Sequence, residues 1–193
     1  MKKIIVLLIS IIPFISLAQE EIEKNTKASK YEEYTAKTGV RCKFVDVALE
    51  EIPLKSSDAL HCSVRTILGE TGNCYFYCLE RPAAQSYDRL TAQIAYEDLV
   101  EINKVLSQLK NEVDTDVASK PDYLENKYIT EDGLVVGYYV DLNRAMNKYQ
   151  AHWYIVLNDY SNSIVNIKKA ESMFECFTQA QSKIEELKKK YGK

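Results

Sequence analysis

Hydrophobic and polar positions alternate along this chain with two different periods, and the change from one period to the other occurs twice. Residues 40–47, 62–68 and 74–80 alternate with a period of two, and residues 90–95 do so more weakly. This period is typical of half-buried strands. The apolar residues that follow are spaced as on one face of a helix over residues 96–114: Leu99, Ile102, Leu106, Leu109 and Val113. The first half therefore predicts four strands and an amphipathic helix.

The same order of elements follows a linker over residues 115–125, where Pro121 cannot continue a helix. Strands are predicted over 126–130 and 134–140, on either side of an Asp132-Gly133 hairpin signal. In the next strand, 149–157, Trp153, Ile155 and Leu157 share one face and His152, Tyr154 and Val156 share the other. A short strand at 164–167 and a helix over 169–190 complete the pattern.

The pattern predicts an α+β fold over residues 39–193, with antiparallel sheets and two amphipathic helices. The two halves, 39–114 and 126–191, are interpreted as a duplicated four-strand-plus-helix unit in a single domain. The alternative is one curved antiparallel sheet or half-barrel with both helices on one side.

The N-terminus has the pattern of an export signal. Lys2 and Lys3 precede an apolar run, and Ser16-Leu17-Ala18 ends on the small residues that signal peptidase requires. We expect residues 1–18 to be a signal peptide that is cleaved after Ala18, and the protein to be secreted or periplasmic. Residues 19–38 are expected to be a polar lead-in segment.

The charge balance argues against a nucleic-acid ligand. The 193 residues carry a formal net charge of −3, and nearly half of them are hydrophobic. An acidic exported protein has no general attraction to the phosphate backbone. We therefore expect no nucleic acid among the partners, and no membrane span after signal removal.

Five cysteines make disulfides possible in an oxidising compartment. Cys74 and Cys78 are about 13 Å apart on an extended strand, so they cannot bond to each other there. Pairing among Cys42, Cys62, Cys74 and Cys78 stays open, and buried reduced thiols are the alternative. Cys176, alone in the final helix, is expected to be a buried and unpaired thiol.

Catalytic and metal-binding patterns are weak. His61 and His152 are the only histidines, and the chain has no His-x-x-x-His, Cys-x-x-Cys, Gly-x-Ser-x-Gly or phosphate-binding loop. We therefore expect no catalytic residue, no metal and no cofactor. The alternative is a secreted hydrolase that uses a His/carboxylate or Cys/His site.

Aromatic residues are the one unusual feature of the composition, with fourteen tyrosines in the chain. The candidate binding residues lie on predicted strands: Tyr75, Tyr77, Tyr138, Tyr139, Trp153 and Tyr154. Cross-strand packing also explains aromatic residues in a sheet. The functional hypothesis is an exported, non-enzymatic binding or interaction module. It would hold a protein, peptide or glycan on an aromatic-rich sheet face or edge.

Two stretches carry a resemblance to known proteins: Glu125-Asn126-Lys127-Tyr128 with Asp132 to Tyr139, and Trp153-Tyr154-Ile155. They resemble a group of small exported bacterial proteins with no assigned function, so the resemblance implies no activity. In architecture alone, two four-strand-plus-helix units are similar to single-stranded nucleic-acid-binding folds of the PC4, Whirly and Pur type. Those folds combine aromatics with basic residues, whereas this chain is acidic.

Overall fold

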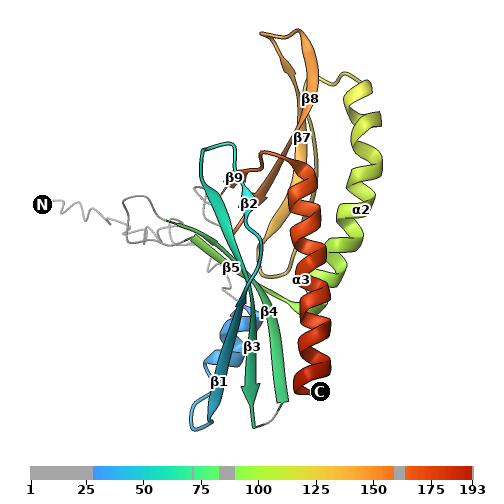
Figure 1. Ribbon diagram of the computed structural model, residues 1–193. Coiled ribbons are helices and arrows are strands. Elements are labelled where there is room, and N and C mark those ends of the chain that lie inside the picture. The colour runs from blue at the N-terminus through green and yellow to red at the C-terminus, as the bar shows by residue number, and fades with distance from the viewer. Residues whose placement is uncertain (1–27, 71, 83–89, 159–163, 193) are drawn as a thin grey trace, which may run out of the picture.

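Two antiparallel sheets and two long helices form the molecule, in the order that the pattern predicts (Figure 1). The structure is a computed structural model that describes residues 28–70, 72–82, 90–158 and 164–192. The predicted signal peptide and residues 19–27 of the lead-in lie outside the described residues. The α+β fold with two similar four-stranded units is confirmed.

The first sheet has the strand order β1-β3-β4-β5, and the short strand β2 pairs with β3. Its strands are β1 (Cys42–Ala48), β2 (Ile52–Pro53), β3 (Ala59–Gly69), β4 (Gly72–Arg81) and β5 (Leu90–Ala95). The second sheet has the order β6-β7-β8-β9. Its strands are β6 (Leu124–Ile129), β7 (Val135–Asn143), β8 (Lys148–Val156) and β9 (Ile164–Asn166).

Two short elements lie outside the predicted strands and the two predicted amphipathic helices. Strand β2 has only two residues, too few for a periodic signal. Helix α1 (Lys30–Thr35) lies in the lead-in and begins at a capping box, in which Ser29 and Glu32 satisfy each other's backbone groups. The predicted helix at 96–114 is α2 (Tyr96–Ala118), which extends further than expected because Pro121 stops a helix only near its own position.

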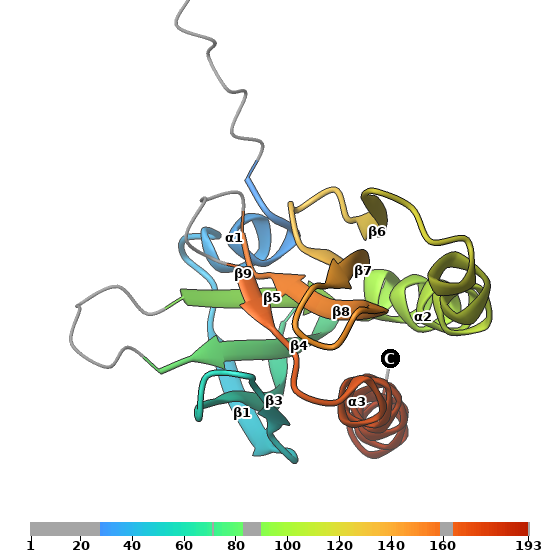
Figure 2. The same cartoon turned by 90° about the horizontal axis from the view of Figure 1, so that it is seen from above.

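Helices α2 and α3 (Ala170–Tyr191) lie side by side and cover the inner faces of both sheets (Figure 2). Helix α3 packs on β2, β3 and β4, whereas α2 packs on β4 to β8. Each helix therefore contacts the sheet of the other half, and the buried residues of both halves form one core cluster. The Phe177 ring in α3, for example, meets the Tyr77 ring of β4 edge-on at 5.1 Å.

A short ladder joins the two sheets at the end of β2. Leu54 forms a β-bridge with Ile167, and the Lys55 amide donates to the Asn166 carbonyl at 2.9 Å. The two halves thus form two sheets rather than one, with Lys55 placed beside β9.

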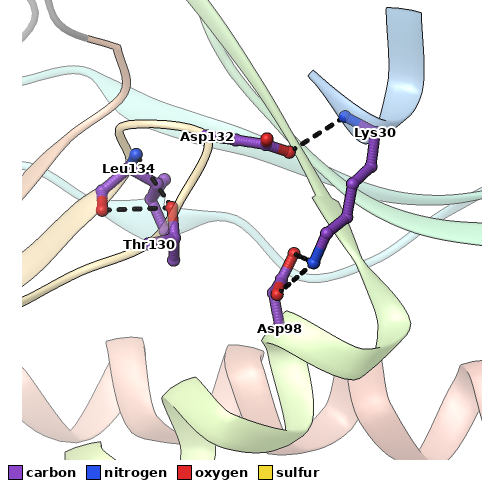
Figure 3. A network of polar contacts seen from close by, with 5 residues as sticks. All are labelled: Lys30, Asp98, Thr130, Asp132 and Leu134. Atoms are coloured by element: carbon purple, nitrogen blue, oxygen red, sulfur yellow. Dashed lines mark hydrogen bonds and ion pairs between the residues drawn. The ribbon is translucent and has the colours of Figure 1, made fainter. Parts of the chain in front are cut away.

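Helix α1 covers the outer face of the first sheet. Tyr31 meets Phe76 edge-on at 5.1 Å, and Tyr34 packs against the same small cluster. The Lys30 ammonium bonds both carboxylate oxygens of Asp98 at 2.6 and 2.8 Å, and the Lys30 amide donates to Asp132 in the β6–β7 turn (Figure 3). Helix α1 is thereby attached to the start of α2 and to the second half of the chain.

Candidate functional site

The six aromatic residues that the sequence singles out divide between the two sides of the sheets. Tyr75, Tyr77, Tyr138 and Trp153 lie in the main core cluster. The expectation that these four contribute to an exposed binding face is therefore wrong. Side chains alternate along a strand, and theirs point to the side that α2 and α3 cover. Tyr139 and Tyr154 point to the other side of the second sheet, where Tyr139 is half-buried and Tyr154 is 5% exposed.

The candidate site is the outer face of the second sheet, named the open face below. It consists of the outward positions of β6 to β9 and two flanking residues. Strand register places them in neighbouring rows: Tyr123, Glu125, Lys127, Ile129, Val135, Gly137, Tyr139, Asp141, Gln150, His152, Tyr154, Val156, Ile164, Asn166 and Lys55. In Figure 1, α2 and α3 lie on the opposite side of β7 and β8.

An aromatic stack lies at the centre of the open face. The Tyr139 ring is 4.8 Å from the His152 ring, at an interplanar angle of 27°. Tyr123 stacks beyond it with a centroid distance of 6.4 Å and an angle of 22°, and Tyr123 is 63% exposed. These three rings offer a rigid aromatic surface at low entropic cost.

Two charged side chains hold His152 in the stack. Lys55 Nζ lies 2.6 Å from His152 Nδ1, and Asp141 Oδ1 lies 3.0 Å from Nε2. An ammonium group can only donate, so Nδ1 accepts from Lys55, whereas Nε2 lies beside both Asp141 Oδ1 and the Gln150 amide nitrogen, which is 3.1 Å away. Burial lowers the pKa of Lys55, and Asp141 opposes that effect. The His152 ring is thus fixed in orientation from both sides.

Tyr154 spans the sheet across a glycine. It pairs with Gly137 on β7, and its hydroxyl donates to Glu125 Oε1 on β6 at 2.6 Å. The ring therefore lies across β7 where Gly137 has no side chain. Lys127 bonds the same carboxylate at 2.8 Å and, together with Tyr154, lowers the pKa of Glu125.

An aliphatic row crosses all four strands at the end of the open face near the β6–β7 turn. The strand register pairs its members in sequence: Ile129, Val135, Val156 and Ile164. The two outer members, Ile129 and Ile164, are 56% and 51% exposed. Aliphatic side chains in such a row have few contacts of their own and favour an apolar partner.

A hollow near the β2–β3 connection is the second candidate site. Its volume is about 430 Å³, and its lining includes Glu51, Ser57, Asp58, His61 and Lys168. His61 Nε2 lies 3.2 Å from Glu51 Oε1, and both side chains are 54% exposed. Water screens such an exposed pair, which limits its electrostatic effect.

All five cysteines are free thiols. The predicted burial of Cys176 is confirmed. Although Cys176 is remote from the other cysteines in sequence, α3 packs on β3 and brings it against Cys62. Within the described residues no group of three or more His, Cys, Asp or Glu side chains is placed to hold a metal ion.

Several residues of the open face are missing from the sequence-based candidates, and only some have a sequence signal. His152 and Val156 share a face with Tyr154 in the strand pattern, which suffices to group them. Tyr123 and Lys55 lie outside the predicted strands, and only the ladder between β2 and β9 brings Lys55 to His152.

Comparisons with protein-family models, with curated proteins and with solved structures found no match. Among the described residues, none of the helices is long and apolar enough to cross a membrane. Function is therefore inferred from the geometry of the open face.

Proposed function

We propose that this protein is an exported, non-catalytic binding module that holds a polypeptide partner on the open face. The observation that carries the proposal is the exposed aromatic and aliphatic surface on a sheet face opposite the helix layer. Export is part of the proposal and rests on the signal pattern of residues 1–18.

The side chains of the open face favour a polypeptide over a glycan or a nucleic acid. The aliphatic row needs apolar groups opposite it, which apolar side chains provide. The aromatic stack suits an apolar or aromatic side chain. Both signs of charge lie around the aromatic stack, with Glu125 beside Lys127 and Asp141 near Lys55. Such mixed charge suits a partner that also carries both signs.

The test is capture from the extracytoplasmic fraction of cells that export the protein, with immobilised wild-type chain and two variants. Ile164→Asp places a charge in the aliphatic row, and Tyr139→Ala removes the centre of the aromatic stack. Phe44→Ser is the matched control, because Phe44 is also exposed (49%) but lies on the outer face of the first sheet. Circular dichroism checks that each variant folds.

We expect a polypeptide that wild type and Phe44→Ser retain and that both open-face variants lose. Equal retention by all four proteins, or its loss only with Phe44→Ser, would contradict the proposal.

Hydrolysis is a second candidate function, favoured by the hollow that contains Ser57, His61 and Glu51. In that case Ser57 would be the nucleophile, His61 its base and Glu51 the group that orients His61. A hydrolase of this type would cleave activated esters, and Ser57→Ala and His61→Ala would each abolish the rate. Equal rates in wild type and both variants would exclude it.

A further inference from the structure

Two cysteines from opposite ends of the folded chain meet in the core. Cys62 lies on the inner face of β3 and Cys176 in the buried stripe of α3. They are 5% and 2% exposed. Helix α3 packs on β3, so the final helix brings the two residues together.

The crossover between β1 and β2 locates both sulfur atoms. The Leu49 amide donates to the Cys62 carbonyl at 2.9 Å, and Ile52 pairs with Leu60, so residues 50 and 51 lie opposite Cys62. The Cys176 thiol lies 3.6 Å from the Glu50 carbonyl oxygen and 3.9 Å from that of Glu51. Both thiols therefore lie at the same crossover, where the Cys62 thiol donates to the Leu60 carbonyl at 3.5 Å.

The surroundings make Cys62 the more acidic of the two thiols. The neighbouring Cys176 thiol lowers the pKa of Cys62, and the Tyr77 hydroxyl acts in the same direction. The same contact raises the pKa of Cys176. In the folded chain Cys62 is thus the more readily ionised of the two thiols.

We propose that Cys62 and Cys176 form a disulfide that ties the last helix to the first sheet. The oxidant is a disulfide donor, either a small-molecule disulfide or a protein one. One of the two thiolates attacks one donor sulfur, which forms a mixed disulfide and releases one donor thiol. The other cysteine thiolate then attacks the protein sulfur of the mixed disulfide and releases the second donor thiol. Two electrons and two protons pass from the cysteines to the donor.

Burial determines when this bond forms. Because both thiols are enclosed between α3 and the first sheet, a donor reaches them while α3 is still undocked. The bond therefore forms during folding, and it closes a loop that holds most of the described chain. Such a cross-link stabilises the folded state mainly by restricting the unfolded chain.

The other three cysteines provide a matched control within the same chain. Cys42, Cys74 and Cys78 lie on the outer face of the first sheet, in or beside the cluster that α1 covers. Cys74 and Cys78 are on one extended strand, too far apart to bond each other. The fold therefore separates them from Cys62 and Cys176.

The experiment is refolding of the reduced full chain with oxidised glutathione, followed by alkylation of free thiols and tryptic peptide mapping without reduction. Wild type is compared with the triple variant Cys42→Ser, Cys74→Ser, Cys78→Ser. Peptide 56–65 contains Cys62 and peptide 170–183 contains Cys176, so their bond gives one linked species. The urea midpoint of the oxidised chain is compared with that of the same chain after reduction.

We expect the linked species 56–65/170–183 as the main product in both proteins, and a higher urea midpoint for the oxidised chain. Cys176→Ala should abolish both the linked species and the shift in midpoint. Alkylation of both Cys62 and Cys176 in folded, oxidant-treated protein would overturn the proposal, as would predominant pairing of Cys62 with Cys42, Cys74 or Cys78.

Discussion

The two sheets share a strand order and an inner cover of helices, but their outer faces differ. On the first sheet, α1 lies over Phe76, Ile67 and Ala95 and brings Tyr31 and Tyr34 against them. On the second sheet the outward side chains form the open face, where Ile129 and Ile164 are more than half exposed. One outer face is thus used for packing within the chain, whereas the other exposes two large aliphatic side chains.

The polar contacts of the two outer faces follow the same division. On the first sheet, Arg65 bonds Asp46 through two nitrogens at 2.8 and 2.7 Å and donates to the Tyr31 hydroxyl at 2.7 Å, which ties α1 down. On the second sheet, Lys55 and Asp141 fix the His152 ring within the face itself. The contacts of Arg65 attach α1 to the first sheet, whereas the contacts of Lys55 and Asp141 fix a side chain of the open face itself.

The largest expected effect concerns the inner core that the two sheets share. Phe177 is fully buried between α3 and the first sheet. Phe177→Ala should destabilise the protein by about 3–5 kcal/mol, as cavity-forming core substitutions do. Urea denaturation followed by both tryptophan fluorescence and circular dichroism measures this, because Trp153 reports on the second sheet. Two separate transitions, or a loss below about 1 kcal/mol, would contradict a shared inner core.

Gly137→Ala tests how closely β6 approaches β7 beneath the open face. A Cβ at this position would lie 2.5 Å from the Asn126 carbonyl oxygen and 2.7 Å from Lys127 Cβ. The strands would have to separate, at a cost of about 1–3 kcal/mol. The control is Val156→Ala on the same face, where only a half-buried side chain is shortened. Equal urea midpoints for Gly137→Ala and wild type would show that β6 and β7 accommodate a Cβ at this position without separating.

Tyr31→Ala removes the main contact of α1 with the first sheet. The loss of the Phe76 ring contact and of the bond to Arg65 should cost about 1–2 kcal/mol. Tyr31→Phe keeps the ring and separates the two contributions. An unchanged free energy of unfolding for Tyr31→Ala would mean that α1 does not stabilise this face, and the contrast between the outer faces would fail.

The smallest expected effect concerns the open face itself. Tyr123→Ala should change the free energy of unfolding by less than about 0.5 kcal/mol, as exposed substitutions usually do. The matched measurement is Tyr31→Ala under the same conditions. A loss for Tyr123→Ala as large as that for Tyr31→Ala would indicate that the open face stabilises the fold instead of remaining available.

Much of the fold follows from the periodicity of the sequence, because a strong amphipathic pattern specifies a helix or strand from the residues of that segment alone. The spacing of Leu99, Ile102 and Leu106 specifies a helix whichever sheet that helix covers. The pattern does not reveal that α2 also packs on the second sheet and that α3 packs on the first, since both sheets offer an apolar inner face. The polar composition of the lead-in does not indicate helix α1, although α1 begins at a capping box.

The candidate site was predictable only in part. Residue type alone makes both Tyr138 and Tyr139 candidate binding residues. Tyr138 is nevertheless in the core, and Tyr139 is on the open face. Which side of a strand faces the helices depends on tertiary packing. Likewise, Cys176 is remote from Cys62 in sequence, and only the docking of α3 on β3 brings their sulfur atoms together.

The most direct test of the open face is photo-cross-linking in cells that export the protein. A benzophenone amino acid replaces Ile164 in one protein and Phe44 in another, two positions with nearly equal exposure on the two outer faces. The account predicts a polypeptide adduct at Ile164, weakened by Tyr139→Ala in the same chain, and none at Phe44. An adduct at Phe44 with none at Ile164 would contradict it.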